Sequence, residues 1–373
     1  MDTLDPGTAA LVRRRIDALG PAYRLFYEEP VQIVRGDGVH LYDADGLEYL
    51  DAYNNVASLG HAHPRVTEAV CAQLGVLNTH TRYLHEGIVR YAEDLLSTLP
   101  AGLGHVMFTC TGSEAGDLAL RIAKHHTGSA GVIVTRNAYH GVTTEVAAIS
   151  PSLGGPESLP PWVRTVPAPD AYRVDPVAEG YADLGEWFAA QVQAAIDDLA
   201  THGIGLAAFV ADSIFASDGV LPDPAGFLAP VRGVVARAGG VYVADEVQPG
   251  FGRTGDAMWG FQRHGGPDSP FVPDVVTIGK PMGNGLPIAA TVLRPDVVAE
   301  FGRDMRYFNT FGGNAVSVAA AQAVLDAVRD EHLQQNAASV GAELRAMLAE
   351  LSSRHAAIGD VRGAGLFLGV ELV

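Results

Sequence analysis

Two stretches of sequence decide the fold: VADEVQPGFGRTG at residues 243–255 and VTIGKPMGNG at residues 276–285. Each begins with a short apolar run typical of a buried strand, and the two runs lead to Asp245 and Lys280. Charged residues at the carboxyl ends of parallel strands meet at one edge of an open α/β sheet, where such sheets bind ligands. The two stretches therefore predict a sheet that brings Asp245 and Lys280 to a ligand site.

The sequence around these stretches has the alternation expected of such a sheet. Short apolar runs alternate with helical patterns, which predicts an α/β fold with a mostly parallel central sheet covered by helices. The expected strands span residues 105–110, 131–135, 206–212, 241–245, 275–279 and 288–293, with helices at 113–126 and 223–238. The stretch 150–180, rich in Pro, Ser and Gly, reads as a long surface excursion.

The two ends of the chain predict a smaller α+β domain. Residues 31–53 read as hairpin strands outside the main sheet, and long helices at 315–329 and 337–353 precede a last strand at 365–372. The expected division is therefore an N-terminal segment, 1–53, that contributes to the small domain, a large domain, 54–295, and a C-terminal small domain, 296–373. Because the chain stops on a strand with no expected partner, we expect the small domain to be incomplete there.

Composition excludes several classes of function. The chain has 373 residues and a formal net charge of −18, which repels phosphate backbones and anionic lipids, so we expect no nucleic-acid or membrane partner. The acidic N-terminus lacks the order of a secretory signal, which favours a cytoplasmic protein. Cys71 and Cys110 have no metal-ligand spacing and suit a reducing compartment. The histidines also lack such spacing, so we expect no metal site.

Lys280 and Asp245 together suit one cofactor. A lysine between Gly279 and Pro281, at the end of an apolar strand, has a desolvated amine that can form a Schiff base with the aldehyde of pyridoxal 5′-phosphate. Asp245 would pair with the pyridinium nitrogen, so that the ring can take up carbanion charge. For either residue alone, a snorkelling lysine or a turn-capping aspartate is the simpler interpretation. The combination favours the cofactor.

A phosphate site is also expected after the strand at 105–110. Thr111 and Glu114 have the spacing of a capping box, which predicts that a helix begins there. The N–H groups of Gly112 and Ser113, with the Ser113 hydroxyl, then face an anion at the positive end of that helix. Most capping boxes only cap helices, so this pattern alone does not establish a phosphate site. It supports one only in combination with Lys280 and Asp245.

Two further loops offer cofactor contacts. Tyr139 follows the strand at 131–135 and can stack on a flat ring, although an aromatic residue there is more often a lid on the core. Thr310 precedes the helix at 315–329 and offers a second hydroxyl for a phosphate, or an ordinary loop-to-helix turn.

Five motifs, in family order, make the chain resemble the class III aminotransferases, which are pyridoxal-phosphate enzymes of fold type I. The motifs are TGSEA (111–115), YHG (139–141), DEVQPGFGRTG (245–255), GKPMGNG (279–285) and TFGGN (310–314). The resemblance implies a homodimer with shared active sites. The cofactor-binding residues that it implies are Lys280 as the Schiff-base lysine, Asp245 at the pyridine nitrogen, Gln248 near the ring hydroxyl, Gly112 and Ser113 at the phosphate, Tyr139 stacked on the ring, His140 beside it, and Thr310 at the neighbouring subunit's phosphate.

The chain departs from the family pattern at three positions. Cys110 and Thr111 stand where the family usually has Asn and Ser, and Asp212 stands where it usually has Glu. The carboxylate of Asp212 is one methylene shorter, which leaves its role open.

A narrower resemblance points to a lyase. Residues 51–66, 77–100, 166–173 and 271–287 are similar to the ethanolamine-phosphate and phosphohydroxylysine phospho-lyases. This implies that Lys280 removes a proton from the carbon bearing the amine and that phosphate leaves from the adjacent carbon. Ethanolamine phosphate would give acetaldehyde, ammonia and inorganic phosphate.

Four residues are candidates for holding the phosphate of the substrate. Arg82 is the first, because a guanidinium fork matches a phosphate, although a surface or interface salt bridge is an equal alternative. Asn54 and Asn55 can donate amide hydrogens or simply make a turn, and Arg24 is a weaker candidate.

The sequence leaves two other functions open. A class III omega-aminotransferase would use the same residues, with Arg82 binding the carboxylate of a keto acid. A non-catalytic relative is also conceivable, but retention of Lys280 and Asp245 argues against it.

Overall fold

The computed structural model describes residues 4–155 and 158–373, and these form two compact units. The first unit runs to Asn54 and also includes Ser58–Pro64. Its elements are α1 (Pro6–Leu19) and an antiparallel sheet of β1 (Ile33–Asp37), β2 (His40–Asp43) and β3 (Glu48–Leu50). The Asp5 side chain caps α1 by accepting hydrogen bonds from the N–H groups of Gly7 and Thr8. The hairpin strands expected outside the main sheet are confirmed.

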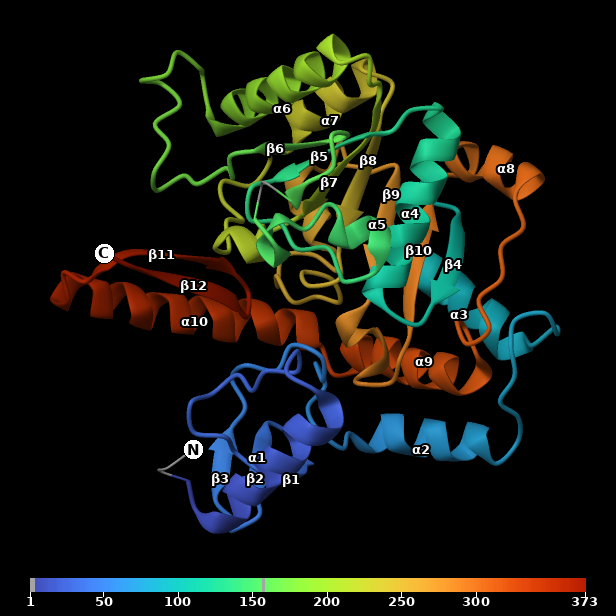
Figure 1. The fold of residues 1–373 in the computed structure, drawn as a ribbon, viewed down its shortest axis with the longest axis vertical. Helices are drawn as coiled ribbons and strands as arrows, with labels where there is room; N and C mark the ends of the chain where they lie inside the picture. The colour runs from blue at the N-terminus through green and yellow to red at the C-terminus, as the bar shows by residue number, and fades with distance from the viewer. Residues whose placement is uncertain (1–3, 156–157) are drawn as a thin grey trace. The chain divides into compact units, whose positions relative to one another are not determined.

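The second unit, Asn55–Ala57 with Arg65–Val373, holds the central sheet (Figure 1). Seven strands lie in the order β4-β10-β9-β8-β7-β5-β6. They are β4 (His105–Thr109), β5 (Gly131–Thr135), β6 (Val163–Val166), β7 (Leu206–Asp212), β8 (Val241–Asp245), β9 (Val275–Ile278) and β10 (Ala289–Leu293). Neighbouring strands in the series β9-β8-β7-β5-β6 pair in parallel, whereas β10 is antiparallel to both of its neighbours, β9 and β4. The expected mostly parallel sheet is confirmed.

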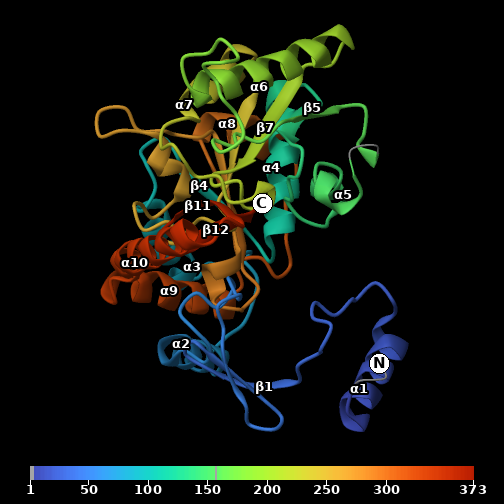
Figure 2. The ribbon, with the colours of Figure 1, turned by 90° about the vertical axis from the view of Figure 1, so that its left-hand side faces the viewer.

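Both faces of this sheet are buried, which explains why its strands are almost continuously apolar. On one face, Val134 and Val210 belong to a core cluster with residues of α4 (Gly112–Thr127). Side chains alternate along a strand, so Phe209 points to the other face. There its ring lies 5.4 Å from Tyr242 and 6.2 Å from Phe188 of α6 (Leu184–Thr201). Figure 2 shows α6 beside α7 (Ala229–Arg237), with which it packs.

The remaining elements frame the sheet. They are the helices α2 (Pro64–Leu74), α3 (Glu86–Leu96), α5 (Thr144–Ala147), α8 (Pro295–Asp304), α9 (Ala315–Asp330) and α10 (Leu333–Arg354), the short 3₁₀ helices η1 (Pro151–Leu153), η3 (Ala216–Asp218), η4 (Gly260–His264) and η5 (Lys280–Gly283), and the antiparallel pair β11 (Ile358–Ala364) and β12 (Phe367–Leu372). Helix α9 packs against α3 and η5. None of the helices in the described ranges is long and apolar enough to cross a membrane.

Three expectations about secondary structure are wrong in detail. The stretch expected to be a surface excursion contains the edge strand β6, whose Val163 and Val166 are buried. The last strand has a partner, β11, which the sequence pattern did not reveal. The helix expected from residue 223 begins only at Ala229. The division into a large domain and a C-terminal small domain stays a prediction.

The packing of α10 yields a test of the fold. At Gly341, on α10, a Cβ atom would overlap the backbone of Gly365, with Gly365 Cα 2.8 Å away. Gly341→Ala should therefore destabilise the protein by about 1 to 3 kcal/mol, because the backbone must move. Gly302 on α8 has open space around it, so Gly302→Ala should stabilise by about 0.5 to 1 kcal/mol. Denaturant unfolding measures both variants, and equal effects would contradict the described packing.

Candidate active site

A cavity of about 130 Å³ lies where the parallel strands end. Its lining combines residues that are far apart in the sequence and follow β4, β5, β7, β8 and β9. These residues are Gly112, Ser113, Tyr139, His140, Gly141, Asp212, Asp245, Val247, Gln248 and Lys280. The structure thus brings Asp245 and Lys280 together, along with most of the residues expected at a cofactor. Gly141 and Val247 are additions to the expected contacts, and both lie inside the quoted motifs YHG (139–141) and DEVQPGFGRTG (245–255).

Asp245 is held in a fixed orientation at the end of β8. Its Oδ2 lies 2.7 Å from His140 Nδ1, and its Oδ1 accepts a hydrogen bond from the N–H of Val247 at 3.1 Å. The backbone N–H of His140 donates to Ser150 Oγ at 2.9 Å. Within the described residues, His140 Nε2 is buried without a hydrogen-bond partner. The carboxylate is therefore anchored on two sides before any ligand binds.

Asp212 ends the neighbouring strand and pairs in register with Asp245. Its carboxylate accepts hydrogen bonds from the N–H groups of Ile214 at 2.9 Å and Ala216 at 3.2 Å. Burial, followed by the negative charge of Asp245, raises the pKa of Asp212 to about 7. The position whose role the sequence left open thus supplies the cavity with a carboxyl that titrates near neutral pH.

Glu246 supports the site from behind. It is fully buried and accepts three hydrogen bonds, from Ser213 Oγ at 2.5 Å and from the N–H groups of Gly260 at 2.7 Å and Phe261 at 2.8 Å. Burial raises the pKa of Glu246 to about 8 against the opposing effect of these donors. Because Ser213 follows Asp212, one side chain ties the ends of β7 and β8 to η4. Glu246 was not among the predicted site residues, although it directly follows Asp245.

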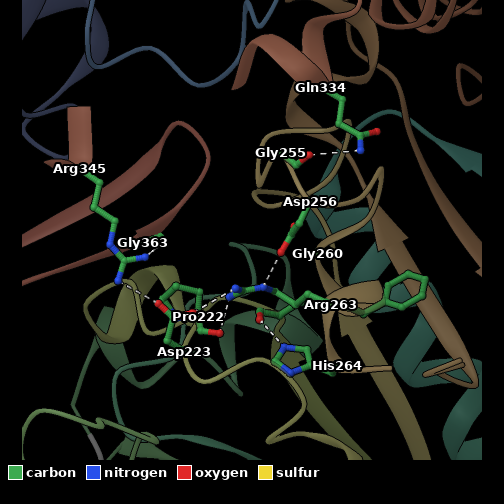
Figure 3. A network of polar contacts seen from close by, with 12 residues as sticks. Pro222, Asp223, Gly255, Asp256, Gly260, Arg263, His264, Gln334, Arg345 and Gly363 are labelled. Atoms are coloured by element: carbon green, nitrogen blue, oxygen red, sulfur yellow. Dashed lines mark hydrogen bonds and ion pairs between the residues drawn. The ribbon is translucent and has the colours of Figure 1, made fainter. Parts of the chain in front are cut away.

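A wider polar network holds η4 in place (Figure 3). Arg263, whose side chain is only 8% exposed, contacts Asp223 and Asp256, each at 3.1 Å. Arg345 of α10 reaches Asp223 at 3.4 Å and donates to the Gly363 carbonyl at 3.1 Å. The C-terminal helix and strands are thereby linked to the loop that carries the donors to Glu246.

Lys280 has an unusual environment and an unusual backbone. It is the first residue of η5 and has a φ of 20°, a value that residues with side chains rarely adopt. Burial lowers the pKa of its amine, while the nearby carboxylates of Asp245 and Asp212 act in the opposite direction. A lowered pKa enlarges the neutral fraction of the amine, which is the form that can attack a carbonyl or accept a proton.

The start of α4 forms the third part of the site. Thr111 Oγ1 accepts from the Glu114 N–H at 3.1 Å, and Glu114 Oε2 accepts from the Thr111 N–H at 3.0 Å, so the predicted capping box is present. Gly112 and Ser113 follow at the positive end of the helix and line the cavity. A Cβ on Gly112 would lie 2.9 Å from Val247 Cγ2, so only glycine allows this close approach.

Together these groups fit pyridoxal 5′-phosphate. The helix start offers N–H groups to a phosphate, Asp245 offers an anchored carboxylate to a ring nitrogen, and Lys280 offers a desolvated amine to an aldehyde. No group of three or more His, Cys, Asp or Glu side chains in residues 4–155 and 158–373 is arranged to hold a metal ion.

Other expected site residues lie elsewhere. Arg82 and Thr310 are exposed and do not belong to the cavity lining found among the described residues. Asn55 donates from Nδ2 to Gln248 Oε1 at 2.9 Å, which connects it to the cavity wall. Arg24 and Asn54 belong to the N-terminal unit, and their roles stay predictions.

The sheet and the cavity define a pyridoxal-phosphate-dependent enzyme of fold type I. The chain belongs to the class III aminotransferase family, whose family model, Aminotransferase class-III, matches residues 26–373. Enzymes of this family depend on pyridoxal 5′-phosphate.

Similar proteins carry two kinds of name. The chain is 41% identical to the alanine–glyoxylate aminotransferase 2-like protein of Drosophila melanogaster, over 97% of this chain and 74% of that protein. It is 37% identical to ethanolamine-phosphate phospho-lyase homolog 1 of Caenorhabditis elegans, over 97% and 79%. Among solved structures, it resembles a phospholyase from Arthrobacter in complex with phosphoethanolamine, with 44% identity, a TM-score of 0.90, and coverage of 97% and 84%. An omega-transaminase from Thermomicrobium roseum has 29% identity, a TM-score of 0.85, and coverage of 98% and 84%.

The raised pKa of Asp212 predicts how stability depends on pH. A carboxyl with a folded-state pKa of about 7, against an ordinary value of 3.8, binds a proton that the unfolded chain releases, so its contribution to stability is lost as the pH rises between these values. Each unit of pKa corresponds to about 1.4 kcal/mol. Asp212→Asn removes this loss, so the stability of the cofactor-free variant relative to wild type should rise by about 1 to 3 kcal/mol from pH 5 to pH 8.

Denaturant unfolding at the two pH values measures this change. Asp198→Asn serves as a control, because Arg164 lowers the pKa of Asp198 and no such rise is expected. A difference between the Asp212→Asn variant and wild type that stays constant from pH 5 to pH 8 would contradict the titration assigned to Asp212.

Proposed function

We propose that the protein is a phospho-lyase that eliminates inorganic phosphate and ammonia from a phosphorylated amine, with ethanolamine phosphate as the substrate and acetaldehyde as the product. The observation that carries the proposal is the 44% identity, over 97% of this chain, to a phospholyase solved with phosphoethanolamine. The relative from Caenorhabditis elegans named as a phospho-lyase homolog adds support.

Most of the cavity residues have a defined task in this reaction. The cofactor, when bound, supplies an electron sink for negative charge that develops on the substrate carbon bearing the amine. Asp245, oriented by His140, would hold the proton on the ring nitrogen, and Gln248 would contact the ring hydroxyl. Gly112 and Ser113 would bind the cofactor phosphate through their N–H groups, and Tyr139 would cover the ring face.

Lys280 is the base of the reaction. Its neutral amine, favoured by burial, takes the proton from the carbon that bears the nitrogen. The electron pair left behind forms a carbon–carbon double bond, the adjacent carbon–oxygen bond breaks, and phosphate leaves with that bonding pair. The released enamine takes up water and yields acetaldehyde and ammonia. No oxidant or amine acceptor is consumed.

Arg82 and Thr310 act in the cavity of a second copy of the chain. Their loops touch, because the Arg82 guanidinium lies 3.8 Å from the Phe308 ring centroid and the His80 ring lies 5.6 Å from the same centroid. Around them, Leu84 is fully exposed and Phe311 is 70% exposed. Apolar side chains exposed to this degree suit an interface between copies. The assembly we propose is a homodimer in which Arg82 binds the substrate phosphate across the interface.

We also propose a cytoplasmic location. Cys71 and Cys110 are free thiols, which a reducing compartment preserves.

The second candidate function is an omega-aminotransferase. It is favoured by the 41% identity to a relative named as aminotransferase-like and by the structural similarity to omega-transaminases. The same residues would serve, but the amine would stay on the cofactor and pass to a keto acid or an aldehyde.

The two functions differ in their products. Incubating the holoenzyme with ethanolamine phosphate alone should release phosphate, acetaldehyde and ammonia in equal amounts over many turnovers, and adding a keto acid should not change the rate. Lys280→Met should abolish the release. Conversion of the cofactor to its amine form, without free phosphate, would overturn the lyase proposal and establish the aminotransferase.

The role of Arg82 is tested by its substitution. Arg82→Gln should raise the KM for ethanolamine phosphate by about 10- to 100-fold, because a charge-assisted hydrogen bond contributes about 1.5 to 3 kcal/mol. Arg121 of α4 lies over the Phe301 ring of α8 and is a matched control, so Arg121→Gln should leave the KM unchanged.

Hybrid dimers test the contribution across the interface. The Arg82→Gln variant keeps Lys280, and the Lys280→Met variant keeps Arg82, so mixing them should restore a complete cavity and recover activity. The assay uses ethanolamine phosphate well below the KM of the Arg82→Gln variant. If the mixture is then no more active than the separate variants under conditions where subunits exchange, Arg82 does not serve the partner.

A further inference from the structure

The guanidinium of Arg253 has no carboxylate partner among the residues that the structure describes. Its Nε is buried without a hydrogen-bond partner among the described residues, and its Nη2 donates to the backbone carbonyl of Asn55 at 3.2 Å. Burial lowers the pKa of its guanidinium, and no neighbouring carboxylate in residues 4–155 and 158–373 offsets this effect. A buried charge without a counter-charge is costly, so it points to an anion that this position receives from outside.

Three other shielded arginines of the chain have carboxylate partners. Arg263 is 8% exposed at its side chain and contacts two aspartates. Arg362 is 12% exposed and contacts Asp360 at 3.1 Å and Glu371 at 2.6 Å. Arg232 contacts Asp274 at 2.7 Å. The arrangement at Arg253 therefore differs from that of these three arginines.

Arg253 lies next to the active-site cavity. Asn55, which accepts its hydrogen bond, donates its own side-chain amide to Gln248 at 2.9 Å, and Gln248 lines the cavity. The positive charge of Arg253 also contributes to the lowered pKa of Lys280. The guanidinium is thus two hydrogen bonds from the cavity wall and close enough to act on the amine at its centre.

We propose that Arg253 binds the phosphate of the substrate within its own subunit, opposite the Arg82 that the partner contributes. This inference rests on the proposed function and names a second cation for the same dianion. A phosphate monoester carries close to two negative charges, and a guanidinium offers several N–H donors in a planar fork that matches phosphate oxygens. The unpaired Nε is such a donor. The phosphate of the cofactor would instead lie at the start of α4, where Gly112 and Ser113 line the cavity.

Binding of inorganic phosphate to the holoenzyme tests this assignment apart from catalysis. Calorimetric titration should show that Arg253→Gln weakens phosphate binding by about 10-fold or more, the effect of losing a charge-assisted hydrogen bond. The KM for ethanolamine phosphate should rise to a similar extent, with a smaller change in kcat. Ethanolamine, which lacks the phosphate, should perturb the cofactor absorbance equally in the variant and in wild type.

Two further variants separate anion binding from a structural role. Arg232→Gln, which loses a buried arginine elsewhere, should leave phosphate binding unchanged. Arg253→Lys keeps the charge but loses the fork, so it should weaken phosphate binding by about 3- to 10-fold, and it replaces the glutamine variant if that variant fails to fold. An unchanged phosphate affinity in either the Arg253→Gln or the Arg253→Lys variant, or an equal loss of phosphate and ethanolamine binding, would overturn the assignment.

The outcomes also separate this inference from the proposed function. If wild type releases no phosphate from ethanolamine phosphate, the lyase proposal fails. The anion site still stands in that case, provided that phosphate affinity depends on Arg253.

Discussion

The parallel pairing of β7, β8 and β9 is the constraint on which the site depends. Asp212 lies in register with Asp245, and Asp245 lies in register with Thr277, three residues before Lys280. Both faces of these strands are buried, and a shift of one residue would exchange the side chains of the two faces. The apolar core therefore fixes the register, and the register brings two carboxyl groups and one amine to the same edge. Chemistry at this edge is a consequence of packing elsewhere.

The cost of placing these charges together explains their titration. At Asp212, burial and the negative charge of Asp245 both disfavour the carboxylate, so its pKa rises. At Lys280, burial disfavours the ammonium form and outweighs the opposing effect of the two carboxylates, so its pKa falls. Asp212, with a pKa of about 7, can therefore exchange protons at physiological pH. Glu246 and the network of Arg263 and Arg345 hold these elements in position, because their hydrogen bonds and ion pairs connect the strand ends to η4 and α10.

Local sequence patterns predicted the central architecture because each depends on a few adjacent residues. The strands that end at Asp245 and Lys280, the capping box at Thr111 and the mostly parallel sheet follow from short apolar runs and residue spacing. Strand β6 was missed because proline, serine and glycine dominate its surroundings, although Val163 and Val166 are buried by the sheet beside them. Helix α7 begins late for a similar reason, since a proline-containing segment precedes it.

Contacts between distant segments could not be predicted in the same way. No spacing rule links Glu246 to Ser213, or Arg253 to Asn55, because tertiary folding alone brings these residues together. The role of Asp212 was open for the same reason, since its environment depends on Asp245 of the next strand. The sequence identified the chemistry of the site, whereas the groups that tune it became visible only in three dimensions.

The central claim is that Lys280 binds the cofactor covalently, and the composition of the chain makes it easy to test. The protein has only two lysines. The other lysine is Lys124 of α4, which contacts Glu145 of α5 at 2.5 Å. Reduction of the holoenzyme with borohydride, followed by digestion and mass mapping, should place one pyridoxyl group on the peptide that contains Lys280. A pyridoxyl group on Lys124, or on neither lysine, would contradict the account.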